Sequence, residues 1–251
     1  MKLLIMRKGF GVFLVFGFII FSCSTKDQVI PDFGLEYYPL QVDNYSIYQV
    51  DETHIVQSIE TKTSYELKVT ITDSSINQQG VVTYILVREK RASASDNWVS
   101  LDTWSAKVVN NSVIQNEGNV LFVKLVFPPA LNVAWDGNQY NNLKVDENPF
   151  NVNLPYDGNI LTDNNSDQYV ISEQQESITL PSGFEAANAL TVTHNNFQDN
   201  IVGTDQRKEV YAKDVGLIYK EINQYINCNG SICNGDKAGV LIQSLKEHGK
   251  I

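Results

Sequence analysis

The chain has 251 residues and a formal net charge of −10, with 19 Lys and Arg against 29 Asp and Glu. Three of the basic residues lie in residues 1–22, so the remaining 229 residues carry 16 basic and 29 acidic side chains. Binding to nucleic-acid phosphates depends on clustered Lys and Arg, so this composition excludes a nucleic-acid-binding surface. The acidic residues are spread along the chain, which indicates solubility rather than a cation site.

The first residues have the pattern of a secretory signal. Lys2, Arg7 and Lys8 precede an uncharged apolar run from Phe10 to Phe21. A run of about a dozen residues fits the apolar region of a signal peptide and is shorter than the about 20 residues that a spanning helix needs. We therefore expect export, with residues 1–22 as the signal peptide.

The sequence Ile20-Phe21-Ser22-Cys23 ends this signal. It resembles the lipobox of Gram-negative bacterial lipoproteins, in which a small residue precedes a cysteine that carries acyl chains. The resemblance implies that Cys23 becomes a lipid-attached N-terminus; an ordinary signal or an uncleaved anchor with a chance cysteine is the alternative. Several acyl chains give stable anchoring, whereas one chain is marginal. Ser24 is not the aspartate that retains such proteins at the inner membrane, so we expect the outer membrane, on its periplasmic face or at the cell surface.

Two further cysteines support an oxidising compartment. Cys228 and Cys233 bracket Asn229-Gly230, and Asn-Gly is a strong signal for a tight hairpin turn. An even pair in an exported chain indicates a disulfide, here across the hairpin. The alternative is a redox or metal-binding pair, but the spacing is not Cys-x-x-Cys and only the distant His248 could join as a ligand.

Residues 23–36 are polar and lack periodicity, so we expect a flexible tether followed by one domain at 37–251. Tyr65 to Thr72 alternates apolar and polar residues, as a half-buried antiparallel strand does. Val120 to Phe127 is the most apolar stretch of the domain and is expected to be the central strand. The expected strands are 45–50, 54–59, 65–72, 81–90, 98–109, 120–127, 168–171, 176–180, 189–194, 209–212, 215–226 and 239–245.

Turn residues separate these strands. We expect turns at Asp51-Glu52, at 77–80, at Asn110-Asn111 and at 117–119. The charged residues 88–91 read as strand-end charges that keep a sheet edge soluble, with a basic patch as the alternative. The pattern predicts an all-β fold: a mainly antiparallel meander of about ten strands, curved into a half-barrel or a sandwich.

The segment 128–167 differs in texture, being rich in Asn, Asp, Gly and Pro. Nearly 40 residues without clear strands is long for a compact domain. We expect a loop-rich insertion that either contains short elements or forms a functional loop.

Three motifs carry a resemblance. The sequences Tyr38-Pro39-Leu40, Trp135-Asp136-Gly137-Asn138 and 209–218 (Glu-Val-Tyr-Ala-Lys-Asp-Val-Gly-Leu-Ile) resemble a group of uncharacterised Gram-negative outer-membrane lipoproteins. That group has a Tyr-x-Pro-Leu motif near its start and a Glu-x-Tyr-Ala-Lys-x-Val-Gly-Leu signature near its end. The resemblance implies an exported β-rich module and supplies no activity. Gly216 inside the last motif indicates a bulge or the close approach of another backbone.

Catalysis is not expected. The three histidines are His54, His194 and His248, and no Gly-x-Ser-x-Gly, His-x-x-x-His or Gly-rich phosphate loop accompanies them. His194 shares a strand face with Leu190 and Val192, which favours a half-buried structural histidine. The paired carboxylates of a glycosidase cannot be recognised among the ordinary acidic residues of 157–176.

No cofactor or metal is expected either. Residues 163–167 (Asp-Asn-Asn-Ser-Asp) match the first five positions of a calcium loop, but Gln168 replaces the glycine and Gln174 replaces the final glutamate. An Asn- and Asp-rich surface loop is the better interpretation.

Aromatic residues are the remaining candidates for ligand binding. Trp98, Trp104, Trp135 and Tyr140 could stack on a glycan or line a lipid cavity, although large aromatics of β proteins are mostly core. Trp135 and Tyr140, in the irregular segment, are the predicted ligand-binding residues. The sequence thus predicts a non-enzymatic, lipid-anchored module that binds or scaffolds an envelope protein, glycan or lipid; the alternatives are a carrier with a half-barrel cavity and an envelope hydrolase.

Overall fold

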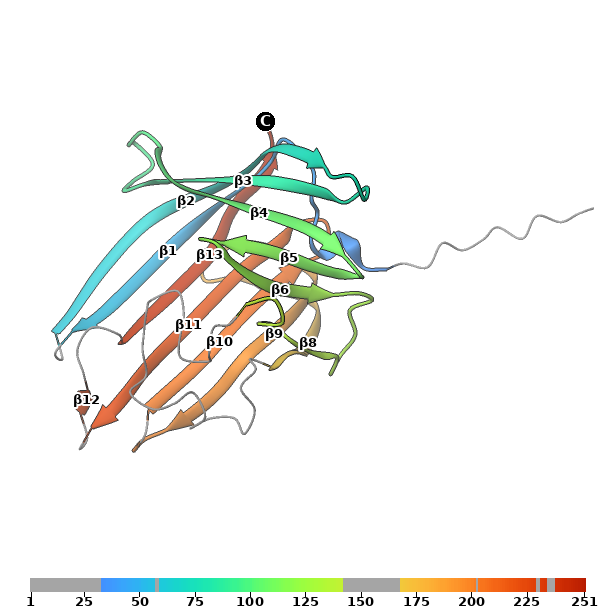
Figure 1. The fold of residues 1–251 in the computed structure, drawn as a ribbon. Coiled ribbons are helices and arrows are strands. Elements are labelled where there is room, and N and C mark those ends of the chain that lie inside the picture. Colours follow the sequence, from blue (N-terminus) through green and yellow to red (C-terminus); the bar gives the residue numbers. More distant parts are fainter. Residues whose placement is uncertain (1–32, 57–58, 142–167, 202, 229–230, 234–237) are drawn as a thin grey trace, which may run out of the picture. The chain divides into compact units, whose positions relative to one another are not determined.

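The structure is a computed structural model that describes residues 33–56, 59–141, 168–201, 203–228, 231–233 and 238–251. The described residues form one short 3-10 helix and strands of a single sheet (Figure 1). The elements are η1 (Leu35–Tyr37), β1 (Asn44–Val56), β2 (Ile59–Ile76), β3 (Val82–Arg91), β4 (Val99–Val109), β5 (Ser112–Glu117), β6 (Val120–Val126), β7 (Ala134–Asp136), β8 (Gln168–Thr179), β9 (Glu185–Asp199), β10 (Gly203–Ala212), β11 (Gly216–Cys228), β12 (Ser231–Cys233) and β13 (Ala238–Lys250). The predicted all-β class is confirmed.

The sheet is an antiparallel meander in two runs. Twelve strands follow the order β6-β5-β4-β3-β2-β1-β13-β11-β10-β9-β8-β7, and β12 pairs with β11 only. The C-terminal strand β13 lies between β1 and β11 and so joins the first run to the second (Figure 1). The strand predicted at 239–245 is therefore confirmed as part of β13.

The two ends of this path, β6 and β7, meet, so that the sheet is nearly closed into a barrel. The amide of Val123 in β6 donates to the carbonyl of Gly137, just after β7, at 2.9 Å. The indole Nε1 of Trp135 in β7 donates to the carbonyl of Val123 at 2.8 Å. Local hydrogen bonds of this kind protect two strand edges that would otherwise remain open.

Three predicted turns are confirmed by their backbone geometry. Asn110 and Asn111 have φ of 49° and 60°, and Gly118 and Asn119 have φ of 59° and 74°. Two successive residues with positive φ define the turn whose twist suits a two-residue hairpin. In the third turn, the amide of Gly80 donates to the carbonyl of Asn77.

Two predicted breaks are wrong, because the chain continues as a strand through each. Asp51 and Glu52 stay within β1, where Ser64 Oγ donates to Asp51 Oδ1 at 2.7 Å and Tyr65 OH donates to Glu52 Oε1 at 2.8 Å. These cross-strand partners satisfy carboxylates that elsewhere favour turns. The strands predicted at 168–171 and 176–180 are one strand, β8, whose register shifts after Ile171 and so disturbs the alternation.

The apolar strand β6 was predicted to be the central strand. This prediction is wrong, because β6 lies at one end of the sheet path. Val123 and Leu125 are nevertheless buried. Leu125 packs in one cluster with Ile171 of β8, Val192 of β9 and Tyr211 of β10, strands from the other end of the path. The apolar run of β6 therefore indicated burial where the two ends of the sheet meet, and not a central position in the sheet.

The segment of residues 34–43, which includes η1, crosses between distant strands. The amide of Asp214, after β10, donates to the carbonyl of Glu36, and the amide of Asp43 donates to the carbonyl of Ile71 in β2, both at 2.8 Å. Tyr38 packs against both the cluster of Tyr211 and the cluster of Ile71. The segment thus links the two halves of the sheet.

The close approach predicted at Gly216 is found, but it is made by the ring of Pro39 rather than by a backbone. Gly216 begins β11 with φ of 91°, and a Cβ built there would lie 3.2 Å from Cδ of Pro39. Glycine is needed both for the left-handed backbone and for the passage of the segment of residues 34–43.

Several predictions lie wholly or partly outside the described residues. These are Cys23 and the signal peptide, the calcium-like residues 163–167, and most of the insertion 128–167, in which β7 is the short element that the structure describes. The backbone pairs Cys228 with Ser231 and Cys233 with Ile226. No disulfide is seen in the described part of the chain, the side chains of both cysteines are not described, and the disulfide stays a prediction.

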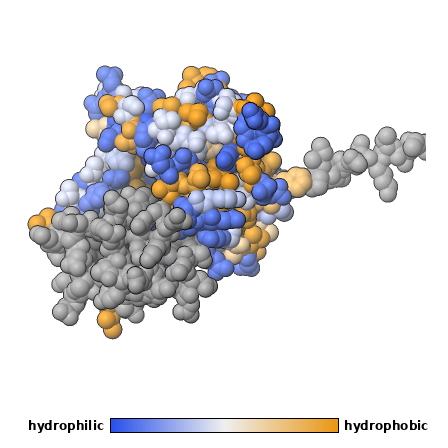
Figure 2. All heavy atoms as spheres, in the orientation of Figure 1, coloured by the Kyte–Doolittle hydropathy of each residue, from blue (hydrophilic) through white to orange (hydrophobic). Residues whose placement is uncertain are grey.

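On the face shown in Figure 2, hydrophobic residues (orange) lie among hydrophilic ones (blue). Among the described residues, no helix has the length and apolarity required to cross a membrane.

Candidate functional site

A cavity of about 470 Å³ opens between the segment of residues 34–43 and the strands that this segment crosses. One wall is apolar and comes from β1, β2, β3 and β11. Its residues are Tyr48, Leu67, Val69, Ile71, Leu86 and Leu217. The other wall carries charged and polar side chains from β5, β6, β10 and β11, so the cavity has an apolar side and a polar side.

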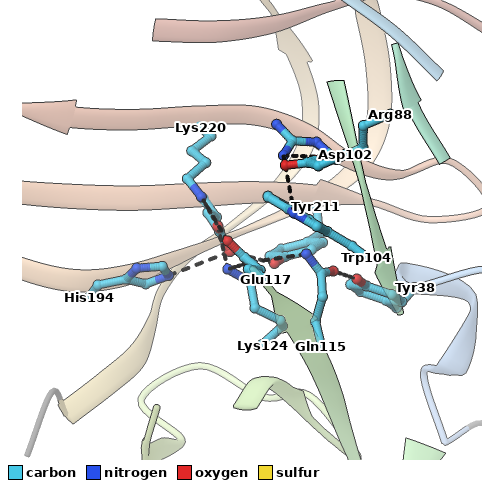
Figure 3. Close-up of polar contacts among 11 residues, drawn as sticks. Tyr38, Arg88, Asp102, Trp104, Gln115, Glu117, Lys124, His194, Tyr211 and Lys220 are labelled. Carbon is cyan, nitrogen blue, oxygen red and sulfur yellow. Dashed lines mark hydrogen bonds and ion pairs between the residues drawn. The ribbon is translucent and has the colours of Figure 1, made fainter. Parts of the chain in front are cut away.

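Two lysines and two glutamates form the polar side, here called the buried ion cluster: Glu117 of β5, Lys124 of β6, Glu209 of β10 and Lys220 of β11 (Figure 3). Lys124 Nζ lies 2.6 Å from Glu209 Oε1 and 3.1 Å from Glu117 Oε1. Lys220 Nζ lies 3.4 Å from Glu209 Oε1 and 3.8 Å from Glu117 Oε2. The side chain of Glu209 is only 1% exposed and that of Lys124 only 5%.

The charges in this cluster balance, which is what makes their burial tolerable. Burial alone would raise the pKa of Glu209, but the ammonium groups of Lys124 and Lys220 overcome burial and hold this pKa well below its ordinary value. Burial alone would likewise lower the pKa of Lys124, but Glu117 and Glu209 raise it instead. Glu117, Lys124 and Glu209 therefore stay ionised around neutral pH, because a buried charge is stable only when it is paired.

Neutral side chains complete the hydrogen bonds of the cluster. Tyr211 OH donates to Glu209 Oε2 at 2.5 Å, and Gln115 Nε2 donates to Glu117 Oε1 at 3.0 Å. Tyr38 OH donates in turn to Gln115 Oε1. Burial, with help from the nearby carboxylates, raises the pKa of Tyr211 and of Tyr38, so both phenols stay protonated as donors. The segment of residues 34–43 is tied to the cluster through this chain of bonds.

His194 lies at the far side of Glu209. Its ring stacks on Tyr169 with centroids 3.7 Å apart, and its Nε2 lies 3.5 Å from Glu209 Oε2. Burial lowers the pKa of His194 and outweighs the attraction of Glu209, with Lys124 and Arg207 acting in the same direction as burial. The predicted structural role is consistent with this environment, in which the imidazole is neutral at pH 7.

Arg88 occupies the apolar side of the cavity. Its Nη1 donates to both carboxylate oxygens of Asp102 at 2.9–3.0 Å, and its guanidinium carbon lies 3.6 Å from the ring centroid of Trp104. Residues 88–91 do lie at the end of β3, as predicted, but they do not protect a sheet edge, because β3 lies between β2 and β4. Arg88 instead lines the cavity, and Arg91 pairs with the buried Glu66.

A second buried network lies farther along β10. Arg207 donates through Nε and Nη2 to the two oxygens of Asp205 at 2.7 and 3.1 Å. Gln224 Nε2 and Asn195 Nδ2 donate to the same carboxylate at 2.9 and 3.0 Å. None of these residues lines the cavity, and we assign the network to stability.

The predicted ligand-binding residues do not meet at the cavity. Trp135 is half-buried, with its indole N–H bonded to Val123 and its ring edge against Tyr169. Tyr140 is exposed, just before the undescribed part of the insertion. Of the four tryptophan and tyrosine candidates, Trp104 lines the cavity. Ligand binding at Trp135 and Tyr140 stays a prediction.

The histidines are not brought together. His54 is on β1 and exposed, His248 is at the cavity rim on β13, and His194 is beside Glu209. Within the described residues no group of three or more His, Cys, Asp or Glu side chains could hold a metal ion.

Sequence reasoning missed the buried ion cluster. One signal was available: Lys124 interrupts the apolar run 120–127, and a lysine in a strand buried on both sides needs a carboxylate partner. The identity of that partner was not readable, because Glu209 is 85 residues away in the sequence. In the sequence, Glu209 stands out only as the first residue of the motif at 209–218.

The fold and site define an antiparallel β-sheet protein with an internal, partly charged cavity. No family model and no curated protein matches the chain. Two crystal structures are similar: a protein inferred to be exported, with a YmcC-like fold, from Bacteroides fragilis NCTC 9343, and a protein inferred to be a lipoprotein from Parabacteroides distasonis ATCC 8503. Each has a TM-score of 0.37 and 13% identity, covering 85% of this chain and 98% of the other. Similarity at this level assigns no function.

Breaking the charge balance of the cluster should destabilise the protein strongly. Glu209→Gln leaves one excess positive charge and Lys124→Met leaves one excess negative charge, so each should lower the free energy of unfolding by about 3–5 kcal/mol. The double variant keeps Lys220 opposite Glu117 and should lose clearly less than the sum of the two. Urea denaturation measures all three, with Glu60→Gln in the exposed pair Lys62–Glu60 as a control of little expected effect. Strict additivity would contradict the coupling.

His194 should make stability depend on pH in the mildly acidic range. Its pKa is lower in the folded chain, so stability is present above the unfolded value of 6.5 and is lost as the pH falls below it. His194→Gln should flatten the decrease in the free energy of unfolding between about pH 7 and pH 5.5, a range above most carboxylate titration. His54→Gln, at an exposed position on β1, is the control for removal of a histidine elsewhere in the chain. An unchanged slope in His194→Gln would rule out this role.

Proposed function

We propose that this chain is a lipid-anchored envelope protein that binds a small molecule with an apolar body in its cavity and does not catalyse a reaction. The observation that supports binding is the cavity itself. Its volume of about 470 Å³ falls in the range of about 300–1,000 Å³ that is usual for ligand pockets. Its apolar wall with a few convergent polar groups is also typical of such pockets. A scaffold would not need this internal space.

The protonation states of the cluster support binding over hydrolysis. A general acid or base works best with a pKa near the operating pH. The pKa of Glu209 is held low and that of Lys124 is held high, because each charge stabilises the other. These groups suit the recognition of a polar part of a ligand and the maintenance of the cavity's shape.

The anchoring part of the proposal rests on the sequence. The lipobox-like Ile20-Phe21-Ser22-Cys23 would place acyl chains on Cys23 and fix the domain to the membrane through residues 23–36. We place the protein at the outer membrane, on its periplasmic face or at the surface. In that oxidising compartment, we also propose the disulfide Cys228–Cys233, which rests on the even cysteine pair in the sequence.

Filling the cavity should abolish ligand binding. Val69 lines the cavity and is half-buried, so Val69→Trp would place an indole in the space of the ligand. The neutral fluorophore N-phenyl-1-naphthylamine should bind the wild-type chain with an increase in fluorescence, and its affinity should fall by about tenfold or more in Val69→Trp, because the lost apolar contact area is large.

The matched control is Val99→Trp, since Val99 on β4 is 60% exposed and lies outside the cavity. This variant should bind the fluorophore as the wild type does. Circular dichroism checks that the variants fold, and Val69→Phe provides a smaller filler. Absence of binding to the wild type, or equal loss in Val69→Trp and Val99→Trp, would contradict ligand binding in this cavity.

Removing the proposed acylation site should release the protein from the membrane. Cys23→Ala should abolish labelling by radioactive palmitate and move the protein from the membrane fraction to the soluble fraction, because the acyl chains provide the anchor. Ser22→Ala keeps a small residue before the cysteine and should leave labelling intact. Membrane retention and labelling that persist in Cys23→Ala would disprove the anchor.

A further inference from the structure

We propose that Arg88 recognises the carboxylate of the ligand, so that the cavity takes an amphipathic carboxylic acid with an apolar chain. This inference rests on the proposed function and specifies its ligand. Three observations support this inference: the unpaired Nε donor of Arg88, the fixed position of its guanidinium, and the apolar residues beside it.

Arg88 has an unused donor inside the protein. Its side chain is 12% exposed, and its Nε is buried without a hydrogen-bond partner in the described part of the chain. A buried donor that stays unpaired is destabilising, and a carboxylate oxygen of a ligand would remove that cost. Asp102 accepts from Nη1 only, so Nε is the buried donor of this guanidinium that lacks a partner among the described residues.

The guanidinium is also held in place before any ligand arrives. Trp104 stacks on it at 3.6 Å, Asp102 binds its Nη1, and Trp104 Nε1 donates to Asp102 Oδ2 at 3.2 Å (Figure 3). A fixed guanidinium loses little entropy on binding, and its planar edge matches the two oxygens of a carboxylate.

The other cations at the cavity are already engaged. Lys124 and Lys220 are neutralised by Glu117 and Glu209, and Lys250 donates to Gln41 at 2.8 Å. Among the described residues that line the cavity, Arg88 is thus the cation with a buried hydrogen-bond donor that has no partner. One guanidinium that already faces Asp102 suits a singly charged carboxylate better than a doubly charged phosphate.

The apolar chain of the ligand has a surface next to this carboxylate position. Val69 on β2 is directly opposite Arg88, and Leu86 precedes it by two residues on the same face of β3. Ile71, opposite Leu86, continues the same wall towards the segment of residues 34–43. A ligand with its carboxylate at Arg88 would lay its chain along these three side chains.

A matched pair of ligands tests this assignment. Dodecanoate and the neutral dodecanol have the same chain, and each displaces N-phenyl-1-naphthylamine from the whole chain carrying Cys23→Ala, in which no acyl chain of its own competes. Dodecanoate should bind about ten- to hundredfold more tightly, the size expected for hydrogen bonds to a charged group. Arg88→Met should remove this preference while leaving the affinity for dodecanol unchanged, and Arg88→Lys should keep part of it.

The matched control variant is Arg91→Met. Arg91 lies on the same strand, binds a carboxylate (Glu66) and stacks on Trp98 at 4.2 Å, but it does not line the cavity. It should keep the full preference for dodecanoate. Circular dichroism and dodecanol binding show that each variant is folded, and Arg88→Lys serves if Arg88→Met does not fold.

The outcomes separate the two proposals. If dodecanol and the fluorophore bind but dodecanoate binds no more tightly, or if the preference survives in Arg88→Met, the assignment of Arg88 is wrong and ligand binding stands. If neither neutral compound binds the wild-type chain, ligand binding in the cavity is wrong and the assignment of Arg88 falls with it. Dodecyl phosphate is a further arm, and tighter binding of it than of dodecanoate would overturn the choice of a carboxylate.

Discussion

The ion pair between Lys124 of β6 and Glu209 of β10 is the constraint on which the cavity depends. These strands are not neighbours in the sheet, so the 2.6 Å contact joins its two halves across the interior. Because both charges are buried, neither side chain can leave the other without a large desolvation cost. Glu117 and Lys220 balance the charges, Tyr211 donates to Glu209, and Tyr38 is linked to Glu117 through Gln115. The curvature of the sheet, the position of the segment of residues 34–43 and the space between them are therefore linked.

The cavity combines this neutral but highly polar cluster with an apolar wall. Such a division suits an amphipathic ligand, because the apolar wall offers burial while polar groups fix orientation. Arg88 differs from the lysines of the cluster in one respect that matters for binding: its charge is held by stacking on Trp104 and by one partner, and its Nε remains unused. The cluster maintains the shape of the site, whereas Arg88 is placed to select the ligand.

Local patterns were most reliable where a single strand or turn decides the structure. The strand at 65–72 and the paired Asn residues at 110–111 were predicted correctly, because each depends on the backbone preferences of a few neighbouring residues. The half-burial expected of 65–72 was wrong in part, since Glu66 and Thr70 of its polar face are buried as well. The turn predicted at Asp51-Glu52 failed, because Ser64 and Tyr65 on the next strand satisfy those carboxylates. The central position predicted for β6 failed because an apolar run reports burial on both faces, and closure of a sheet produces that burial as well as a central position does.

The sequence by itself determined the all-β class, the approximate strands and the acidic character, since these follow from composition and a periodicity of two. It also predicts an export signal, from the short apolar run before Cys23. Only the tertiary structure decided which strands meet at the closure and which charges are neutralised inside. Glu209 reads as an ordinary strand residue until the fold brings Lys124 to it from 85 residues away. Arg88 likewise reads as a surface charge until β4 covers its strand and Trp104 stacks on it. Contacts between distant strands depend on register and curvature, which no local window of residues encodes.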